Sequence, residues 1–255
     1  MTKRNILLLL MTFFFALIST TQSMNAQLDR VKFSVGLSTI QILGNNLATK
    51  PFEHEEAGIY MFGGSFDQSQ SGLKLEALFA LDNEEIFEIP VGFEYYFYKG
   101  REKEQMQGLS DRKFRHDVNI MTFVLGFNYS FFKFNPLNSV AKFYVGLDTR
   151  SSIIFQGRFE QITNDVEQNI FETLTYDTKE DAFRLGGVLK LGLNGRLYEP
   201  LYVDFSAGIG IMNLIGKDDN RGELLTPFKH TVRYNEDEEN LVYNYHLTMM
   251  LQVKL

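Results

Sequence analysis

Residues 87–98, FEIPVGFEYYFY, alternate in character along the chain. The odd positions are apolar or aromatic, whereas the even positions include two glutamates, a glycine and a proline. Because successive side chains of a β-strand point to opposite faces, this period of two predicts a strand with one apolar face. The same odd–even pattern recurs in further segments, namely residues 31–38, 73–81, 123–131, 143–159, 183–197, 201–211 and 243–255.

The connections between these segments fall into two classes. Residues 81–85, 135–139 and 198–200 are short and rich in turn formers. In contrast, the long and polar connections are residues 41–56, 99–117 and 217–240. Alternating segments of about ten residues, joined by short turns on one side and longer loops on the other, are typical of bacterial barrels. The pattern therefore predicts an all-β protein, folded as an antiparallel up-and-down transmembrane β-barrel.

A soluble β-sandwich also alternates, so the length and chemistry of the two faces must separate the alternatives. Residues 183–197 keep phase for 15 residues, whereas a strand in a globular protein usually has about 5–6. The polar face carries glycines and charges of both signs, which suit the interior of a small barrel. Tyrosines cluster at segment ends, as at a membrane interface. We therefore expect the odd-numbered side chains to face lipid and the even-numbered ones to fill the lumen.

The number of strands is less well defined by the pattern. Residues 57–66 are strand-like but apolar on both faces, and residues 169–176 alternate only weakly. Including both gives about 10 strands, within a range of 8–12, and residues 228–234 could raise the number further. Ten strands in simple order would place residues 99–117 on the periplasmic side, where a short turn is expected.

The chain begins with a positive segment at Lys3 and Arg4, an apolar run over residues 6–18 and a polar exit. That order predicts a secretory signal peptide over residues 1–26, with a cut after Ser23 or a buried N-terminal helix as alternatives. Residues 27–255 would then form the barrel domain. The apolar run is too short to span a bilayer as a helix, which takes about 20 residues.

The charge of the chain separates classes of partner. Loss of the leader takes the formal net charge from −7 to about −9, and an acidic balance argues against nucleic acid. With no cysteine in the chain, neither disulfides nor a lipid anchor on a thiol can form. The expected partners are outer-membrane lipid and lipopolysaccharide, together with envelope or secretion proteins.

Four motifs resemble one family of barrels: FEIPVGFEYYF (87–97), KFYVGLDTRSSI (142–153), FRLGGVLKLGL (183–193) and LYVDFSAGIGIMNL (201–214). The mature chain resembles the PorT-like outer-membrane β-barrel family of Bacteroidota. The resemblance implies an outer-membrane location and an eight-stranded core, and some members of the family are implicated in protein secretion or gliding. The segment VNIMTFVLGFNYSFFKF looks like an additional strand, and the terminal Leu255 departs from the phenylalanine frequent at barrel ends.

Candidate chemistry is limited to four histidines. His54 lies in FEHEE, which could bind a divalent ion or form a solvated loop. His116 follows DRKFR in a predicted hydrophilic loop, where it could contact lipid phosphates, and His230 has no serine in a plausible motif. His246 falls on the polar face of the last segment, where we expect a hydrogen-bonding residue of the lumen. The sequence therefore predicts no catalytic, cofactor-binding or metal site and no cofactor.

These observations favour a non-enzymatic outer-membrane barrel, structural or partner-binding through its external loops and linked to secretion or envelope assembly. Acidic loops such as residues 235–240 could bridge lipopolysaccharide phosphates through calcium or magnesium. Two other functions are compatible with alternation. A small transport pore or ligand-holding barrel would need 12 or more strands, and a soluble exported β-sandwich would bind a surface ligand.

Overall fold

The computed structural model describes residues 30–52, 54–56, 59–61, 63–105, 110–136, 139–166, 169–177, 182–217, 224–226 and 239–255. The predicted signal peptide (1–26) and residues 228–234 with His230 lie outside these ranges. Within them, no helix is long and apolar enough to cross a membrane. The short 3₁₀ turn Leu47–Thr49 interrupts an otherwise all-β structure.

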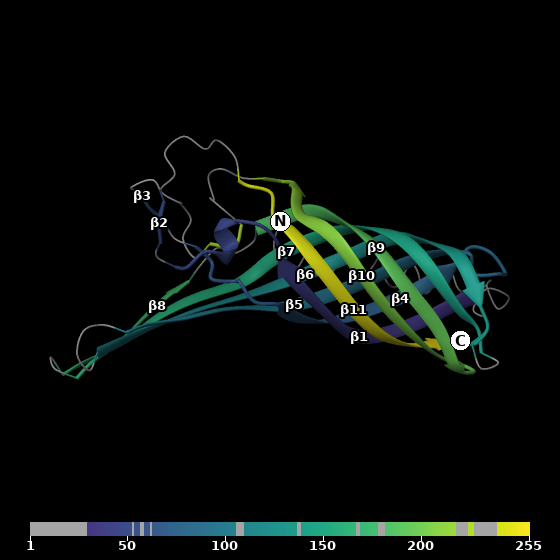
Figure 1. The fold of residues 1–255 in the computed structure, drawn as a ribbon, viewed down its shortest axis with the longest axis horizontal. Helices are drawn as coiled ribbons and strands as arrows, with labels where there is room; N and C mark the ends of the chain where they lie inside the picture. The colour runs from purple at the N-terminus through teal and green to yellow at the C-terminus, as the bar shows by residue number, and fades with distance from the viewer. Residues whose placement is uncertain are drawn as a thin grey trace, which may run out of the picture.

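Eight antiparallel strands close into a barrel (Figure 1). Each barrel strand pairs with the barrel strands that precede and follow it in the chain, including β6 with β7. The first strand, β1, pairs with the last, β11, and this pairing closes the ring. Closure pairs the backbone groups that an open edge would leave unsatisfied in lipid. The barrel strands are β1 (Val31–Ile42), β4 (Gln70–Ala80), β5 (Phe87–Gln105), β6 (Ser110–Phe134), β7 (Ala141–Asp165), β9 (Ala182–Tyr198), β10 (Leu201–Ile215) and β11 (Tyr243–Lys254).

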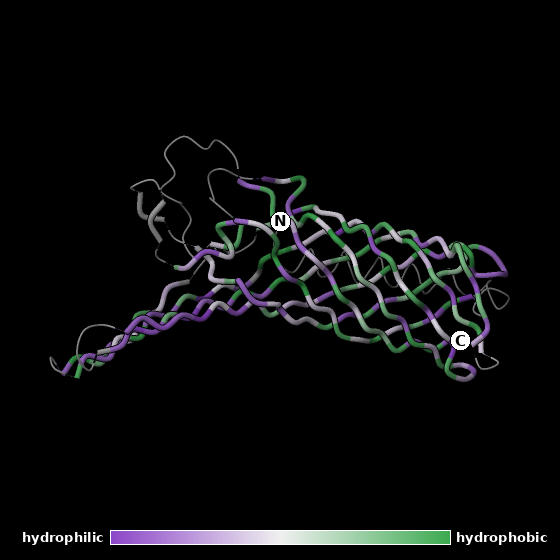
Figure 2. The backbone as a smooth tube through the Cα atoms, viewed as in Figure 1, coloured by the Kyte–Doolittle hydropathy of each residue, from purple (hydrophilic) through white to green (hydrophobic). Residues whose placement is uncertain are grey.

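The predicted up-and-down transmembrane barrel is therefore confirmed, with a strand number at the lower end of the expected range. Along the barrel strands, odd-numbered apolar side chains such as Leu75, Leu191 and Met249 are exposed on the outer wall. Even-numbered polar side chains such as Lys74 and Lys190 are buried inside. Figure 2 shows the resulting alternation of hydropathy along each strand of the wall. A wall of this kind is stable only against an apolar solvent.

Two segments differ from their predicted structure. Residues 99–117 do not form a loop, because β5 continues to Gln105 and β6 begins at Ser110, so most of the segment is a β-hairpin. Residues 169–176 do not add a barrel strand, because they form β8 (Ile170–Asp177), which pairs with the part of β7 beyond the barrel. With eight strands, all three short turns lie at one end of the barrel, and the conflict over residues 99–117 disappears.

At the end of the barrel opposite the three short turns, the described residues form two further parts, which we call the cap and the arm. The arm comprises residues 99–105 of β5, 110–119 of β6, 156–165 of β7, and β8 (Figure 1). The cap comprises residues 43–52, 63–69 and 224–226, and beside it β2 (His54–Glu56) pairs with β3 (Ile59–Met61). In the described part of the predicted segment 57–66, residues 59–61 are a strand and residues 63–66 are not.

A bulge changes the phase of β7 where it leaves the barrel. Ile120 of β6 pairs with Ile154 and Asn119 pairs with Gln156, so Phe155 is an extra residue on β7. Beyond it, Phe159 is buried, although the continuous alternation predicts that it faces lipid. The bulge brings Arg158 and Glu160 to the outer side instead.

Candidate functional site: lumen, cap and arm

One aspartate shapes the turn between β4 and β5. Asp82 accepts hydrogen bonds from the backbone N–H groups of Glu84, Ile86 and Phe87 at 2.8–3.1 Å. Loss of hydration alone would raise the pKa of Asp82, but these hydrogen bonds outweigh it and lower that pKa below 3.8. The turn holds Glu85 in the left-handed region, at φ 53°, where a non-glycine residue is uncommon.

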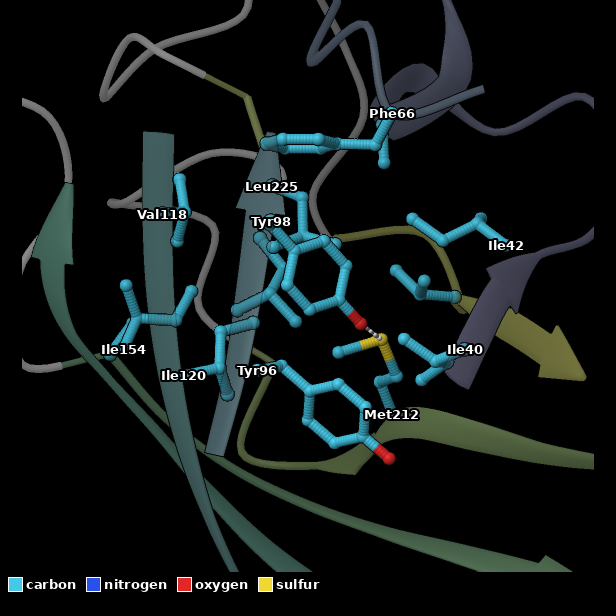
Figure 3. Close-up of a cluster of buried hydrophobic side chains, with 14 residues drawn as sticks. Ile40, Ile42, Phe66, Tyr96, Tyr98, Val118, Ile120, Ile154, Met212 and Leu225 are labelled. Atoms are coloured by element: carbon cyan, nitrogen blue, oxygen red, sulfur yellow. Dashed lines mark hydrogen bonds between the residues drawn. The ribbon is translucent and has the colours of Figure 1, made fainter. Parts of the chain in front are cut away.

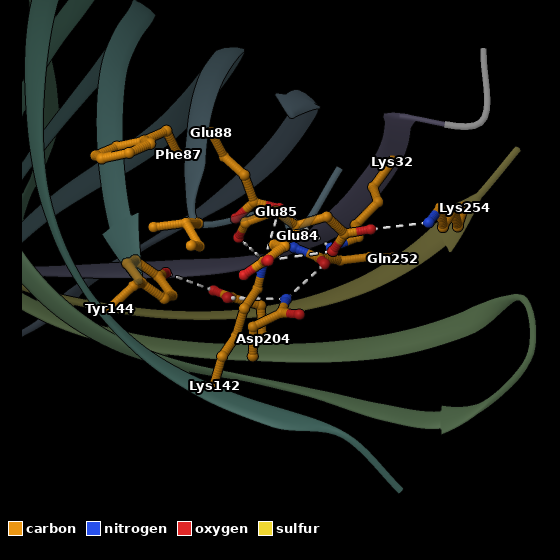
Figure 4. A network of polar contacts seen from close by, with 12 residues as sticks. Lys32, Glu84, Glu85, Phe87, Glu88, Lys142, Tyr144, Asp204, Gln252 and Lys254 are labelled. Carbon is orange, nitrogen blue, oxygen red and sulfur yellow. Dashed lines mark hydrogen bonds and ion pairs between the residues drawn. The ribbon is translucent and has the colours of Figure 1, made fainter. Parts of the chain in front are cut away.

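The Glu85 carboxylate joins three strands across the short-turn end of the lumen. It receives hydrogen bonds from Lys254 of β11 at 2.8 Å, Lys142 of β7 at 3.4 Å, and Lys32 of β1 (Figure 4). Glu88, on β5, lies 3.1 Å from Lys32 and 2.9 Å from Lys142. Burial would raise the pKa of Glu85, but Lys32 and Lys142 lower it to about 2.

The middle of the lumen continues this pattern of paired charges. Each charge is buried, so it is stable only with a partner and hydrogen bonds close by. Tyr144 of β7 donates to Asp204 of β10 at 2.9 Å, which adds a neutral donor to the network. The ion pairs of this part of the lumen include Lys74–Glu76 at 2.7 Å, Lys74–Glu94 at 3.6 Å, Lys190–Asp148 at 2.8 Å, and Arg150–Glu94.

His246 lies in this network, as its polar-face position predicts. Its Nδ1 is 3.5 Å from the hydroxyl of Tyr96, which donates to Glu94 at 2.9 Å and lies 2.6 Å from Ser38 Oγ. All four side chains are buried. A histidine, a serine and a carboxylate thus come together, but the cap and the barrel wall cover them. The arrangement is suited to joining β1, β5 and β11.

An apolar cluster closes the lumen at the end of the barrel that carries the long connections. Phe66, Leu224 and Leu225 of the cap are buried against residues of the upper barrel wall (Figure 3). Phe66 packs edge-to-face on Tyr98, with ring centroids 5.4 Å apart. The wall contributes Ile40, Ile42, Tyr96, Tyr98, Val118, Ile120, Ile154, Ala182, Met212 and Val242.

Below this cluster the described side chains leave a cavity of about 10 Å³, lined by Tyr96, Arg150, Met212 and neighbouring residues. That volume is close to one water molecule. Between the apolar closure and the charged floor, this cavity among the described side chains has room for about one water molecule and is too small for a ligand.

The inner face of the arm packs against the cap. Phe52 of the cap contacts Phe114 and Phe159, with ring centroids 5.7 and 5.2 Å away. His116 is fully buried, and its ring packs on that of Phe66 at a tilt of 30°, with ring centroids 4.9 Å apart. The predicted loop position of His116, in contact with lipid phosphates, is therefore wrong. The cap covers it because it lies on the inner face of a continuous strand.

Most of the basic residues of the arm lie on its outer face. Arg101 of β5 lies directly opposite Arg115 of β6, and Lys103 lies opposite Lys113. We call these four residues the cation block. Arg101 also pairs with Asp117 at 2.5 Å, and the two lysines share Asp111 at 3.4 Å each. Asn164 donates a hydrogen bond to Asp111 and, with these lysines, lowers its pKa.

The remaining predicted candidates do not form a site among the described residues. His54 lies in β2, and within the described ranges no group of three metal-ligating side chains comes together. The sequence reasoning missed Glu85 and the cation block. The signal for Glu85 was the pair of glutamates in a turn between strands that begin or end near lysines. The signal for the cation block was the density of Lys and Arg in residues 99–115.

No protein-family model matches this sequence, and no curated protein matches it. Among solved structures, Neisserial surface protein A is 8% identical, with a TM-score of 0.41, covering 88% of this chain and 97% of that one. Ail, the attachment invasion locus protein of Yersinia pestis, solved with the heparin analogue sucrose octasulfate, is 10% identical, with a TM-score of 0.36, covering 88% and 96%. The translocator domain of autotransporter NalP from Neisseria meningitidis is 11% identical, with a TM-score of 0.37, covering 99% and 98%. The fold of this chain follows from its own strand pairing, and the predicted PorT-like membership stays a prediction.

Proposed function

We propose that this protein is a non-enzymatic, non-conducting outer-membrane barrel that holds its cap and arm outside the membrane for binding another envelope component. The observation that carries the proposal is the filled lumen inside an apolar wall. Paired charges occupy one end of the lumen and an apolar cluster closes the other. What remains available for contact is the lipid-facing wall, the cap and the arm.

The outer-membrane location is the first part to test. Its support is the apolar outer wall, the export order of residues 1–26, and the resemblance to PorT-like barrels of Bacteroidota. The full chain should stay in the membrane fraction after carbonate extraction. It should also migrate faster on a denaturing gel before boiling than after it, since closed barrels resist unfolding in detergent. Release by carbonate, without heat-modifiable migration, would contradict the location.

The absence of transport is the second part. Eight strands leave a lumen that side chains can fill, and the cavity that remains is about 10 Å³. This geometry disfavours the alternative of a small transport pore. We expect the purified protein in a planar bilayer to give no large, stable conductance. A reproducible open level at moderate voltage would contradict a plugged barrel.

The third part of the proposal is that the arm binds a protein partner, and the support for it is the open edge of β8. Among the described residues, β8 pairs with β7 alone, so its other side is an open edge. Its side chains include exposed Ile170, Phe171 and Tyr176, and the strand has no proline or lysine to block pairing. Such an edge can accept an added strand from another chain. This favours a component of secretion or envelope assembly as the partner.

Site-specific photocrosslinking in cells tests the third part. A crosslinker at Thr173, in the middle of β8, should give a discrete higher-mass band that a crosslinker at lipid-facing Leu191 does not give. With the crosslinker kept at Thr173, the second substitution Thr175→Pro should abolish that band without loss of heat-modifiable migration. The same bands from both positions, or none from Thr173, would count against the edge of β8.

A further inference from the structure

We propose that the cation block on the outer face of the arm binds the phosphates of a phosphorylated glycolipid in the outer leaflet. The inference rests on the proposed outer-membrane location and adds the lipid that the arm recognises. The juxtaposition that carries it is two like-charged cross-strand pairs, Arg101 opposite Arg115 and Lys103 opposite Lys113, next to the lipid-facing wall.

Like charges directly opposite each other weaken a sheet. Here two such pairs are adjacent, with Arg101 and Lys103 two positions apart on β5 and their partners two apart on β6. Among the described residues, the acids paired with these four cations are Asp111 and Asp117 on the same two strands and Glu160 on β7. An arrangement that costs stability in the isolated arm is stabilised by a bound anion, because phosphate oxygens would pair with several of these cations at once.

The two faces of the arm differ in charge and in what covers them. By strand register the outer face carries Lys99 and Arg158 in addition to the cation block, against Asp111, Asp117 and Glu160. The inner face carries Glu102, Glu104, Asp165 and Glu172 against Arg112. The ring contacts and hydrogen bonds described between cap and arm involve the inner face, such as those of Phe52 with Phe114 and with Glu102. The basic face is therefore the uncovered one, in a chain whose net charge is −7.

The position of the cation block matches a lipid headgroup. On β5 the lipid-facing series Phe93, Tyr95 and Phe97 continues directly into Lys99, Arg101 and Lys103 on the same face. At about 3.3 Å per residue, Arg101 and Lys103 lie roughly 13 and 20 Å along the strand from Phe97. Because barrel strands tilt by about 35–45°, their height above the apolar band is smaller. The block thus lies just beyond the acyl chains, where lipid phosphates are held.

The test measures binding of bisphosphorylated lipid A to the full chain folded in zwitterionic detergent. The matched pair of variants is Lys113→Glu and Arg112→Glu. They are adjacent in sequence and change the charge equally, but they lie on opposite faces of β6. We expect Lys113→Glu to weaken binding at least threefold and Lys103→Glu/Lys113→Glu at least tenfold, with Arg112→Glu within twofold of the wild type. Removing one phosphate from lipid A should weaken wild-type binding, and so should added salt.

Each outcome has a defined meaning. Equal losses in Lys113→Glu and Arg112→Glu, or equal binding of lipid A and a zwitterionic lipid, would overturn the inference. Competition by inorganic phosphate at the same concentration as lipid A would assign the block to free phosphate and overturn the lipid assignment. If a reversal variant loses heat-modifiable migration, Lys103→Gln replaces it, because this side chain is 62% exposed. Failure of lipid binding by a correctly migrating barrel leaves the proposed function standing, whereas release by carbonate removes both.

Discussion

The carboxylate of Glu85, in the turn between β4 and β5, lies 2.8 Å from the Nζ of Lys254, near the end of the last strand. Lys142 and Lys32 approach the same carboxylate from two other strands. One turn residue thus connects three strands at the short-turn end (Figure 4).

Glu85→Gln should destabilise the barrel by about 2 kcal/mol at neutral pH. This figure is discounted for the water that reaches the partly exposed carboxylate. Because the pKa of Glu85 is lowered from 4.5 to about 2, its stabilisation is complete above pH 4.5 and is lost as the pH falls toward 2. Urea unfolding in detergent from pH 2 to pH 7 measures the difference. The control is Glu84→Gln, an exposed neighbour, and a pH-independent loss would contradict the assignment to Glu85.

Phe66→Ala should open the apolar closure of the lumen. The side chain is fully buried and contacts Tyr98 and His116, so truncation should cost about 3 kcal/mol. Thermal unfolding followed by loss of the compact gel band measures the effect. Phe171→Ala is the control, because Phe171 on β8 is 66% exposed. An equal effect of the two substitutions would mean that the cap does not stabilise the barrel.

Leu191→Arg tests the lipid-facing assignment of the odd positions. Leu191 is 61% exposed in the middle of β9, where arginine near the bilayer midplane should cost about 2–4 kcal/mol. The same substitution at an exposed site in water usually changes stability by less than about 0.5 kcal/mol. Thr173→Arg on the arm supplies that comparison. Refolding yield into lipid vesicles should fall for Leu191→Arg only, and equal yields would place this face in water.

Gly192→Ala should displace the lumen side chain of Tyr144. A Cβ at Gly192 would lie 2.2 Å from the Cζ of Tyr144, which would break its hydrogen bond to Asp204 or strain β9. We expect a loss of about 1–3 kcal/mol. Gly195→Ala on the same strand is the matched control, because its nearest neighbour would be 3.8 Å away. Equal stability of both variants would show that Tyr144 can move at no cost.

The sequence was sufficient for the barrel wall because lipid on one side and a filled lumen on the other impose alternation on every strand. The strands of the arm were not predicted, because the arm has neither lipid on one side nor a lumen on the other. Residues 111–117 of β6 have water on one side and the cap on the other. The inner face mixes Arg112 with Phe114 and His116 instead of carrying an unbroken apolar series, so the period of two is hidden. The phase change at Phe155 was also invisible, because a bulge adds a residue without changing composition.

The sequence was sufficient to predict which residues line the lumen, but not which of them pair. Alternation identified Lys74, Glu94, Lys190 and His246 as interior residues. Which charges pair depends on strand order and register, and with ten strands instead of eight the partners would differ. Glu85 could not be assigned from the sequence, because its role depends on a left-handed turn conformation and on lysines 53, 57 and 169 residues away.

β5, β6 and β7 each continue as one strand from the barrel into the arm, with a bulge at Phe155 where β7 leaves the barrel. Hydrogen bonds between strands are perpendicular to the chain, so a pull along these strands loads many of them in shear at once. The arm is therefore mechanically continuous with the membrane anchor. Tension applied by a bound partner would reach the barrel wall directly, without a hinge to absorb it.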